Sequence, residues 1–258
     1  MISIDLSNKK ILITGALGAI GQFVVNRLLE TGAFLFLTDI HSEEDAEKIL
    51  DNWGVKRDSC RYLKMDVTNR LEVNRVVKDL FLQFPDMDQV IGHAGGCTLH
   101  PFEETTEEAF MDIFNFNFFG QTHLSRAVLK EWTSRKIEGH LMYTSSYVAR
   151  FPHKFIPAYA SSKAALETFV KCLALEYAHA NIRFNIVSPG NVAAGGSLRV
   201  YENDEEYRSF VDRVSPLQRR NQPEAVADAY VYLCSNLANE LNGHILNVDL
   251  GISIPKIG

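Results

Sequence analysis

The sequence contains few cysteines and no long apolar run. Its four cysteines, Cys60, Cys97, Cys172 and Cys234, form no CxxC pair and have no histidine at metal-ligand spacing. Scattered thiols of this kind are typical of reduced, core-packing residues, so we expect neither a disulfide nor a metal site. The N-terminus lacks a basic segment followed by an apolar one, and no stretch of about eighteen apolar residues is free of charge. We therefore expect a cytoplasmic protein that does not bind a membrane.

The chain also lacks an excess of positive charge. It carries 26 Lys and Arg against 32 Asp and Glu, for a formal net charge of -6. This balance disfavours a nucleic-acid surface and leaves a small molecule as the expected partner. An α/β chain of 258 residues commonly forms one domain, and no shift in composition marks a second one. We expect residues 1–258 to form a single catalytic domain.

Short apolar, β-branched or aromatic runs alternate with longer helical patterns along the whole chain. The expected strands lie at residues 9–14, 33–39, 60–66, 88–93, 139–145, 182–188 and 244–249. The expected helices lie at residues 19–31, 43–52, 69–83, 106–131, 157–179 and 223–236. This alternation predicts repeated βα units. The predicted fold is α/β: a single-domain Rossmann-type, doubly wound parallel sheet of about seven strands, with helices on both faces.

Residues 190–222 interrupt this rhythm. The interruption begins within PGNVAAGG (189–196), includes the charged stretch YENDEEYR and ends within PLQRRNQP (216–223), without the pattern of a βα unit. A long interruption in a compact domain is usually functional, so we predict a substrate lid.

The stretch TGALGAIG, residues 14–21, follows an apolar strand and opens a helical pattern. In this context the N-terminus of the helix can bind a pyrophosphate, although a tight turn that binds nothing is the alternative. Asp39 ends the next strand, where a carboxylate can accept hydrogen bonds from ribose hydroxyls. A carboxylate there repels a 2′-phosphate, and neither Gly15 nor Ala16 offers a positive charge. NAD is therefore favoured over NADP.

Tyr159 and Lys163 are four residues apart in a helical pattern, so they share one face. Bringing a tyrosine pKa from ~10 to near 7 takes about 4 kcal/mol, which an ammonium about 4 Å away supplies at an effective dielectric of about 20. The pair can then act as a general acid and base. Ser146 ends a strand thirteen residues before Tyr159 and could hold a substrate oxygen; Ser145 is the competing candidate.

Together these motifs resemble the short form of the short-chain dehydrogenase/reductase family, from about residue 8 to residue 251. The resemblance rests on the TGxxxxxG turn, Asp39, MDV at 65–67, HAG at 93–95, NFFG at 117–120, SS at 145–146, YASSK at 159–163, NIVSPG at 185–190 and the ending from Pro216 to Gly251. It implies four catalytic residues: Tyr159 exchanges a proton with the substrate, Ser146 polarises the substrate, Lys163 lowers the pKa of the tyrosine, and Asn117 holds a water.

The resemblance also implies how the cofactor is bound. The expected NAD-binding residues are Gly15, Leu17, Gly18, Ala19, Ile20, Gly21, Asp39, Ile40, Asp66, Val67, His93, Ala94, Gly95, Tyr159, Lys163, Pro189, Gly190 and Val192. Three positions depart from the usual pattern; one is AAG at 193–195, where the family often has a threonine that contacts the cofactor. Ala19 stands where the family's middle glycine lies, and we expect it to tune NAD affinity only modestly. His93 replaces an amide; it could make binding sensitive to pH or could be a satisfied histidine at a strand end.

The resemblance implies an NAD-dependent oxidoreductase that moves hydride between a secondary alcohol and a ketone. We expect Ser146, His153 and Tyr159 to contact the substrate. Polar residues in the lid and before the tyrosine favour a sugar, polyol or hydroxy acid; they are Arg150, His153, Lys154, Arg199, Tyr201, Arg208 and Arg213. A 3-oxoacyl thioester reductase and a non-catalytic NAD-binding regulator are the alternatives. The family also implies a homotetramer or homodimer, built on the helix that carries Tyr159 and the helix before it.

Overall fold

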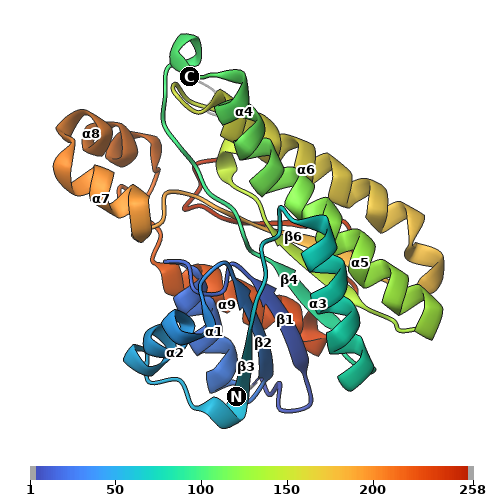
Figure 1. Cartoon of the computed structure of the whole chain (residues 1–258). Coiled ribbons are helices and arrows are strands. Elements are labelled where there is room, and N and C mark those ends of the chain that lie inside the picture. Colours follow the sequence, from blue (N-terminus) through green and yellow to red (C-terminus); the bar gives the residue numbers. More distant parts are fainter. Residues whose placement is uncertain (1–3, 255–258) are drawn as a thin grey trace.

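Each of the seven apolar runs forms a strand of one parallel sheet in the computed structural model, which describes residues 4–254 (Figure 1). The strands are β1 (Lys10–Thr14), β2 (Phe34–Asp39), β3 (Cys60–Lys64), β4 (Gln89–Gly92), β5 (His140–Thr144), β6 (Arg183–Pro189) and β7 (Ile245–Val248). Their order across the sheet is β3-β2-β1-β4-β5-β6-β7, and all neighbours are parallel. The predicted doubly wound sheet is confirmed. Its order reverses between β1 and β4, and ligands of such sheets bind at the carboxyl ends beside that point.

Helices cover both faces of the sheet. They are α1 (Gly21–Glu30), α2 (Glu43–Asn52), α3 (Arg70–Gln83), α4 (Glu107–Phe114), α5 (Gly120–Arg135), α6 (Pro157–Glu176), α7 (Gly195–Asn203), α8 (Glu205–Val214) and α9 (Pro223–Cys234). Helices α1, α2 and α9 pack on one face, whereas α3, α5 and α6 pack on the other. The single helix expected at 106–131 is instead α4 and α5, joined by a π-helical turn at Asn115–Phe119. The turn matters because it carries one of the predicted catalytic residues.

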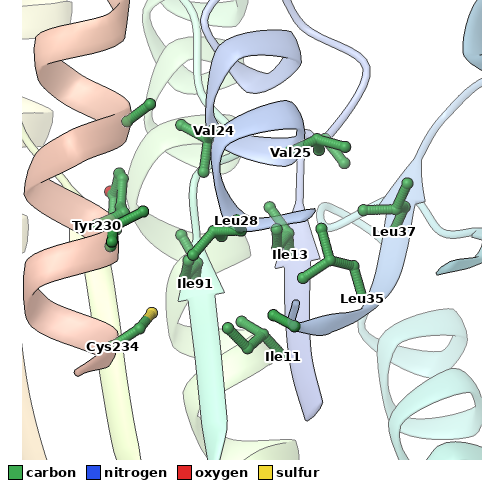
Figure 2. Packing of buried hydrophobic residues seen from close by; sticks show 14 of the residues in the cluster. Ile11, Ile13, Val24, Val25, Leu28, Leu35, Leu37, Ile91, Tyr230 and Cys234 are labelled. Atoms are coloured by element: carbon green, nitrogen blue, oxygen red, sulfur yellow. The ribbon is translucent and has the colours of Figure 1, made fainter. Parts of the chain in front are cut away.

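The core lies in two layers, one on each side of the sheet. Successive side chains of a strand point to opposite faces, so Ile11 and Ile13 join one layer and Leu12 joins the other. In Figure 2 Leu28 of α1 lies over β1 with Ile11 and Ile13, while Tyr230 of α9 lies on the side of Ile91 of β4. A parallel sheet buried on both faces leaves only its strand ends open to a ligand.

The predicted lid region folds into two helices, α7 and α8, which stand beside the body of the molecule in Figure 1. Arg220 fastens it, because its guanidinium donates hydrogen bonds to the Val192 carbonyl and, at 2.9 Å, to the Ser197 hydroxyl. The same guanidinium lies 4.7 Å from the centre of the Tyr201 ring. Arg220, which follows the two helices in the sequence, therefore connects the segment before them with the first turn of α7.

The helices and the cysteines of the described residues bear on two of the expectations drawn from composition. Within residues 4–254, no helix combines the length and the apolar character that crossing a bilayer requires. All four cysteines are free thiols; Cys60 and Cys234 are buried, but Cys97 and Cys172 are exposed. Core packing was thus the correct expectation for only two of them.

Candidate active site

Two adjoining clefts open at the carboxyl ends of the strands. The larger cleft, of about 600 Å³, includes thirteen of the predicted cofactor-binding residues: Gly15, Gly18, Ala19, Ile20, Asp39, Ile40, Asp66, Val67, His93, Ala94, Gly95, Tyr159 and Lys163. The smaller cleft, of about 490 Å³, lies between the lid and the loop after β5. Tyr159 lines both clefts, so a group bound in one lies next to a group bound in the other.

The glycine-rich turn between β1 and α1 forms one wall of the larger cleft. Gly15 has a φ of +66°, and a β-carbon there would lie 2.6 Å from the Ala94 Cα, so only glycine fits. A β-carbon at Gly21 would lie 2.6 Å from the Gly15 carbonyl oxygen, so Gly21 serves the packing of the helix on the turn. No side chain caps the N-terminus of α1. The N–H groups of Ala19, Ile20 and Gly21 have no partner among the described residues, and with the partial positive charge of the helix end they fit a pyrophosphate.

Ala19, the residue that departs from the family pattern, lies where this turn meets the lid. A β-carbon placed on Gly195, the first residue of α7, would lie 2.9 Å from the Ala19 Cβ. The extra methyl group of Ala19 thus faces the start of the lid as well as the cleft.

Asp39 stands at the end of β2 with its carboxylate held in place. Its Oδ2 accepts from the Leu17 N–H at 3.0 Å, while its Oδ1 accepts from the Ile40 N–H at 2.8 Å and lies 2.9 Å from His41 Nδ1. Leu17, expected to bind cofactor, is instead buried in the core and donates its N–H to Asp39. His41 also lines the larger cleft. Sequence reasoning missed it, and its only signal was its place two residues after the acid.

Tyr159 and Lys163 lie on the first turns of α6, which begins at Pro157. Lys163 Nζ donates to the Thr144 carbonyl at 2.9 Å and lies 5.8 Å from the centre of the Tyr159 ring. Burial lowers the pKa of Lys163 to about 8. Burial also raises the pKa of Tyr159 above its ordinary value, against a smaller lowering by the hydrogen bond of Ser146. The expected lowering of the tyrosine pKa by Lys163 is not found, because burial of the phenol dominates and the ammonium is directed at a carbonyl.

The structure distinguishes the two candidate serines. Ser145 donates its hydroxyl proton to Glu167 at 2.9 Å, and the other oxygen of this buried carboxylate lies 3.4 Å from Arg150 Nε. Ser146 lines the smaller cleft and interacts with Tyr159. Both serines line the smaller cleft, but the hydroxyl of Ser145 is bound to Glu167 of α6, whereas Ser146 interacts with Tyr159.

Asn117 lies in the π-helical turn between α4 and α5 and is fully buried. Its Nδ2 donates to the Gly96 carbonyl at 2.8 Å and to the Ile113 carbonyl at 3.0 Å, and its Oδ1 accepts from the Gly96 N–H at 3.1 Å. A β-carbon at Gly95 would lie 2.7 Å from Asn117 Oδ1 and 3.0 Å from Lys163 Nζ. Asn117 is therefore beside Lys163, and its amide ties the loop after β4 to the helix. Such π-turns occur often at functional sites.

The smaller cleft contains the three expected substrate residues, Ser146, His153 and Tyr159. It also contains three residues expected to contact the cofactor, Pro189, Gly190 and Val192. Much of the remaining wall is apolar or aromatic: Leu99, Tyr147, Val148, Ile156, Val200 and Tyr207.

The predicted polar wall of the substrate site is wrong for every residue except His153. The six residues that do not line the smaller cleft are Arg150, Lys154, Arg199, Tyr201, Arg208 and Arg213. Arg150 is occupied by Glu167, and Arg208 donates to the Tyr201 and Glu202 carbonyls on the lid itself. For the lid residues the reason is the periodicity of the helices. One face of α7 and α8 places Val200 and Tyr207 at the cleft, so their charged residues lie on other faces.

The chain is similar to known proteins along nearly its whole length. A family profile described as Enoyl-(Acyl carrier protein) reductase matches residues 15–253. The 2,3-dihydro-2,3-dihydroxybenzoate dehydrogenase of Bacillus subtilis is 30% identical, with 96% of this chain and 97% of that protein covered. The 5-keto-D-gluconate 5-reductase of Escherichia coli is 28% identical, with 97% of each covered. A candidate NAD(P)-dependent gluconate 5-dehydrogenase from Beutenbergia cavernae, solved with NADP at low occupancy, shares the fold with a TM-score of 0.88 at 22% identity, over 96% of this chain and 98% of that one.

Proposed function

The chain belongs to the short-chain dehydrogenase/reductase family, an oxidoreductase family that uses a nicotinamide dinucleotide, and from this we propose that it is an NAD-dependent enzyme that interconverts a secondary alcohol and a ketone. The observation that carries the proposal is the position of Tyr159, which lines both clefts with Lys163 on one side and Ser146 on the other. A cofactor in the larger cleft and an alcohol in the smaller one then meet at the phenol.

Two features of the larger cleft fit a dinucleotide. The N-terminus of α1 has no side-chain cap, and Gly15 lies where no β-carbon would fit. A nicotinamide bound there would supply the hydride acceptor or donor. We assign to Tyr159 the transfer of the proton to or from the substrate oxygen, and to Ser146 the orientation of that oxygen. Lys163, held by the Thr144 carbonyl, provides the adjacent proton-binding group. Asn117 positions the loop and helix around Lys163.

The preference for NAD rests on Asp39. Its carboxylate lines the larger cleft and is fixed by two backbone N–H groups, those of Leu17 and Ile40. A fixed anion there accepts hydrogen bonds from ribose hydroxyls and repels a 2′-phosphate.

We propose a neutral sugar, polyol or ring alcohol as the substrate. Neither lysine nor arginine is among the residues that line the smaller cleft, and burial lowers the pKa of His153, which keeps its ring uncharged. A hydroxy acid would therefore leave its carboxylate without a cationic partner. The aromatic and aliphatic wall suits the carbon face of a ring.

The test is NADH formation by purified protein at mildly alkaline pH, across neutral sugars, polyols and ring alcohols, with hydroxy acids and NADP in parallel. We expect turnover with NAD that falls at least about 100-fold in Tyr159→Phe. Full activity in that variant would overturn the mechanism. If NADH binds but no alcohol or 3-oxoacyl thioester reacts, the non-catalytic regulator replaces the proposed function.

We also propose that the protein is a cytoplasmic homodimer or homotetramer. On α4, Phe110 and Phe114 stack with their ring centres 5.4 Å apart, yet no residue of this helix is fully buried. Met111 of α4 is 47% exposed and Leu175 of α6 is 83% exposed. Apolar surface on α4 and α6 supports the expected interface, because the helix expected at 106–131, before the one that carries Tyr159, begins with α4.

A further inference from the structure

Three side chains form a short series of hydrogen bonds that leads from α9, past the end of β5, to the wall of the larger cleft. The Tyr230 hydroxyl lies 2.5 Å from the Thr144 hydroxyl, which lies 2.7 Å from His93 Nδ1. Tyr230 is completely buried and Thr144 is 9% exposed. His93 follows β4, Thr144 ends the adjacent strand β5, and Tyr230 belongs to the helix that covers them.

The number of protons on these three side chains determines the direction of both hydrogen bonds. Each hydroxyl has one proton, and among the described residues neither has a further hydrogen-bond partner. If His93 Nδ1 donated to Thr144, the proton of either Thr144 or Tyr230 would be buried without an acceptor. That cost is about 1–3 kcal/mol. Only one arrangement gives both hydroxyl protons an acceptor: Tyr230 donates to Thr144, and Thr144 donates to His93 Nδ1.

In that arrangement the imidazole proton is on Nε2. His93 lines the larger cleft, and no group of the described chain hydrogen-bonds to its Nε2. We propose that Tyr230 and Thr144 hold His93 as the Nε2–H tautomer, so that it donates a hydrogen bond to an oxygen of the bound dinucleotide. The oxygen belongs to a ribose hydroxyl or to the pyrophosphate. This assignment rests on the proposed function, since it requires a dinucleotide in that cleft.

The charges around His93 keep its ring neutral. Burial and then the ammonium of Lys163 lower its pKa to about 4, although the carboxylate of Asp39 opposes them. The histidine that replaces the family's amide is thus a fixed neutral donor, as an amide is, and not a pH switch. Between pH 6 and 8 its contribution to cofactor binding stays constant.

The first test measures the tautomer directly. Imidazole ¹⁵N spectra of the protein labelled at histidine, with the His93 signals identified by their absence in His93→Asn, distinguish a protonated Nε2 from a protonated Nδ1. We expect protonation at Nε2 in the wild type and mixed signals in Tyr230→Phe, which removes the hydroxyl and keeps the ring. A protonated Nδ1 in the free wild-type protein would overturn the proposal.

The second test measures NADH affinity by fluorescence titration, which needs no substrate. We expect His93→Leu to raise the Kd about tenfold, as loss of one hydrogen bond requires, and His93→Asn to raise it less. His179→Leu, the same change at an exposed histidine on the surface, is the matched control. An unchanged Kd in His93→Leu rejects the inference alone; failure of the wild type to bind NADH rejects the proposed function itself.

Discussion

At the scale of single residues, burial acts on Tyr159 and Lys163 in opposite directions. It disfavours the charged form of each group, so it raises the pKa of the phenol and lowers that of the ammonium to about 8. Of these two groups, Lys163 is the one that changes charge nearer to neutral pH, and it lies within the proton path that we propose.

This difference predicts a pH profile. Alcohol oxidation releases a proton, which Lys163 can take up only when it is neutral, above pH 8. We expect kcat/KM for alcohol oxidation to rise through about pH 8 and that for ketone reduction to fall over the same range. Initial rates in both directions between pH 6 and 10 test this. Lys163→Met should lose the inflection and at least about 100-fold of kcat; an inflection that survives this substitution would assign it to another group.

Gly95 should tolerate no side chain. A β-carbon there would lie 2.7 Å from Asn117 Oδ1 and 3.0 Å from Lys163 Nζ, so Gly95→Ala displaces one of them. We expect kcat to fall at least about tenfold, because small displacements at a catalytic group are costly. Gly54→Ala is the control: its φ is +70° and nothing lies within 4 Å of the added carbon. It should cost about 1 kcal/mol in unfolding free energy without a loss of kcat; equal kcat values in the two variants would contradict this prediction.

At the scale of elements, the lid depends on one buried cation. Arg220 is 7% exposed and joins the Val192 carbonyl to the Ser197 hydroxyl of α7. Its charged hydrogen bonds are worth about 1.5–3 kcal/mol each, enough to determine whether α7 stays over the clefts.

Arg220→Met should therefore loosen the lid. We expect KM for the alcohol to rise about tenfold with kcat largely retained, and proteolysis between residues 193 and 215 to become faster. Arg219→Met, an exposed neighbour with the same change in charge, is the matched control. The lid role of Arg220 is wrong if the two variants share the same KM and the same cleavage rate.

At the scale of the whole molecule, the surface of α4 and α6 is the proposed contact between subunits. We expect light scattering to give the mass of a dimer or tetramer for the wild type, and Leu175→Glu to reduce it, because a charge in an apolar interface is costly. Leu71→Glu makes the same change on α3, where the side chain is 73% exposed, and should leave the mass unchanged. An unaltered mass in Leu175→Glu places the interface elsewhere.

Local chemistry made much of the fold readable from the sequence. The helix expected at 43–52 is α2 with the same bounds, since the Ser42 hydroxyl accepts from the Asp45 N–H at 3.1 Å and caps its start. The glycine turn and the strand-end acid Asp39 were likewise predicted, because each depends on its own strand and the helix after it. The apolar runs alone determined a buried parallel sheet.

What only the tertiary structure decided involves residues far apart in the chain. The hydroxyl of Ser145, unlike that of Ser146, is bound to Glu167 on α6, and no spacing in the sequence reveals that contact. The proton chain of His93 needs Thr144 from the next strand of the sheet and Tyr230 from α9. The charged lid residues were expected in the cleft, yet the orientation of α7 and α8 turned them outward. Sequence periodicity indicates which residues share a face, whereas the packing of elements determines what that face meets.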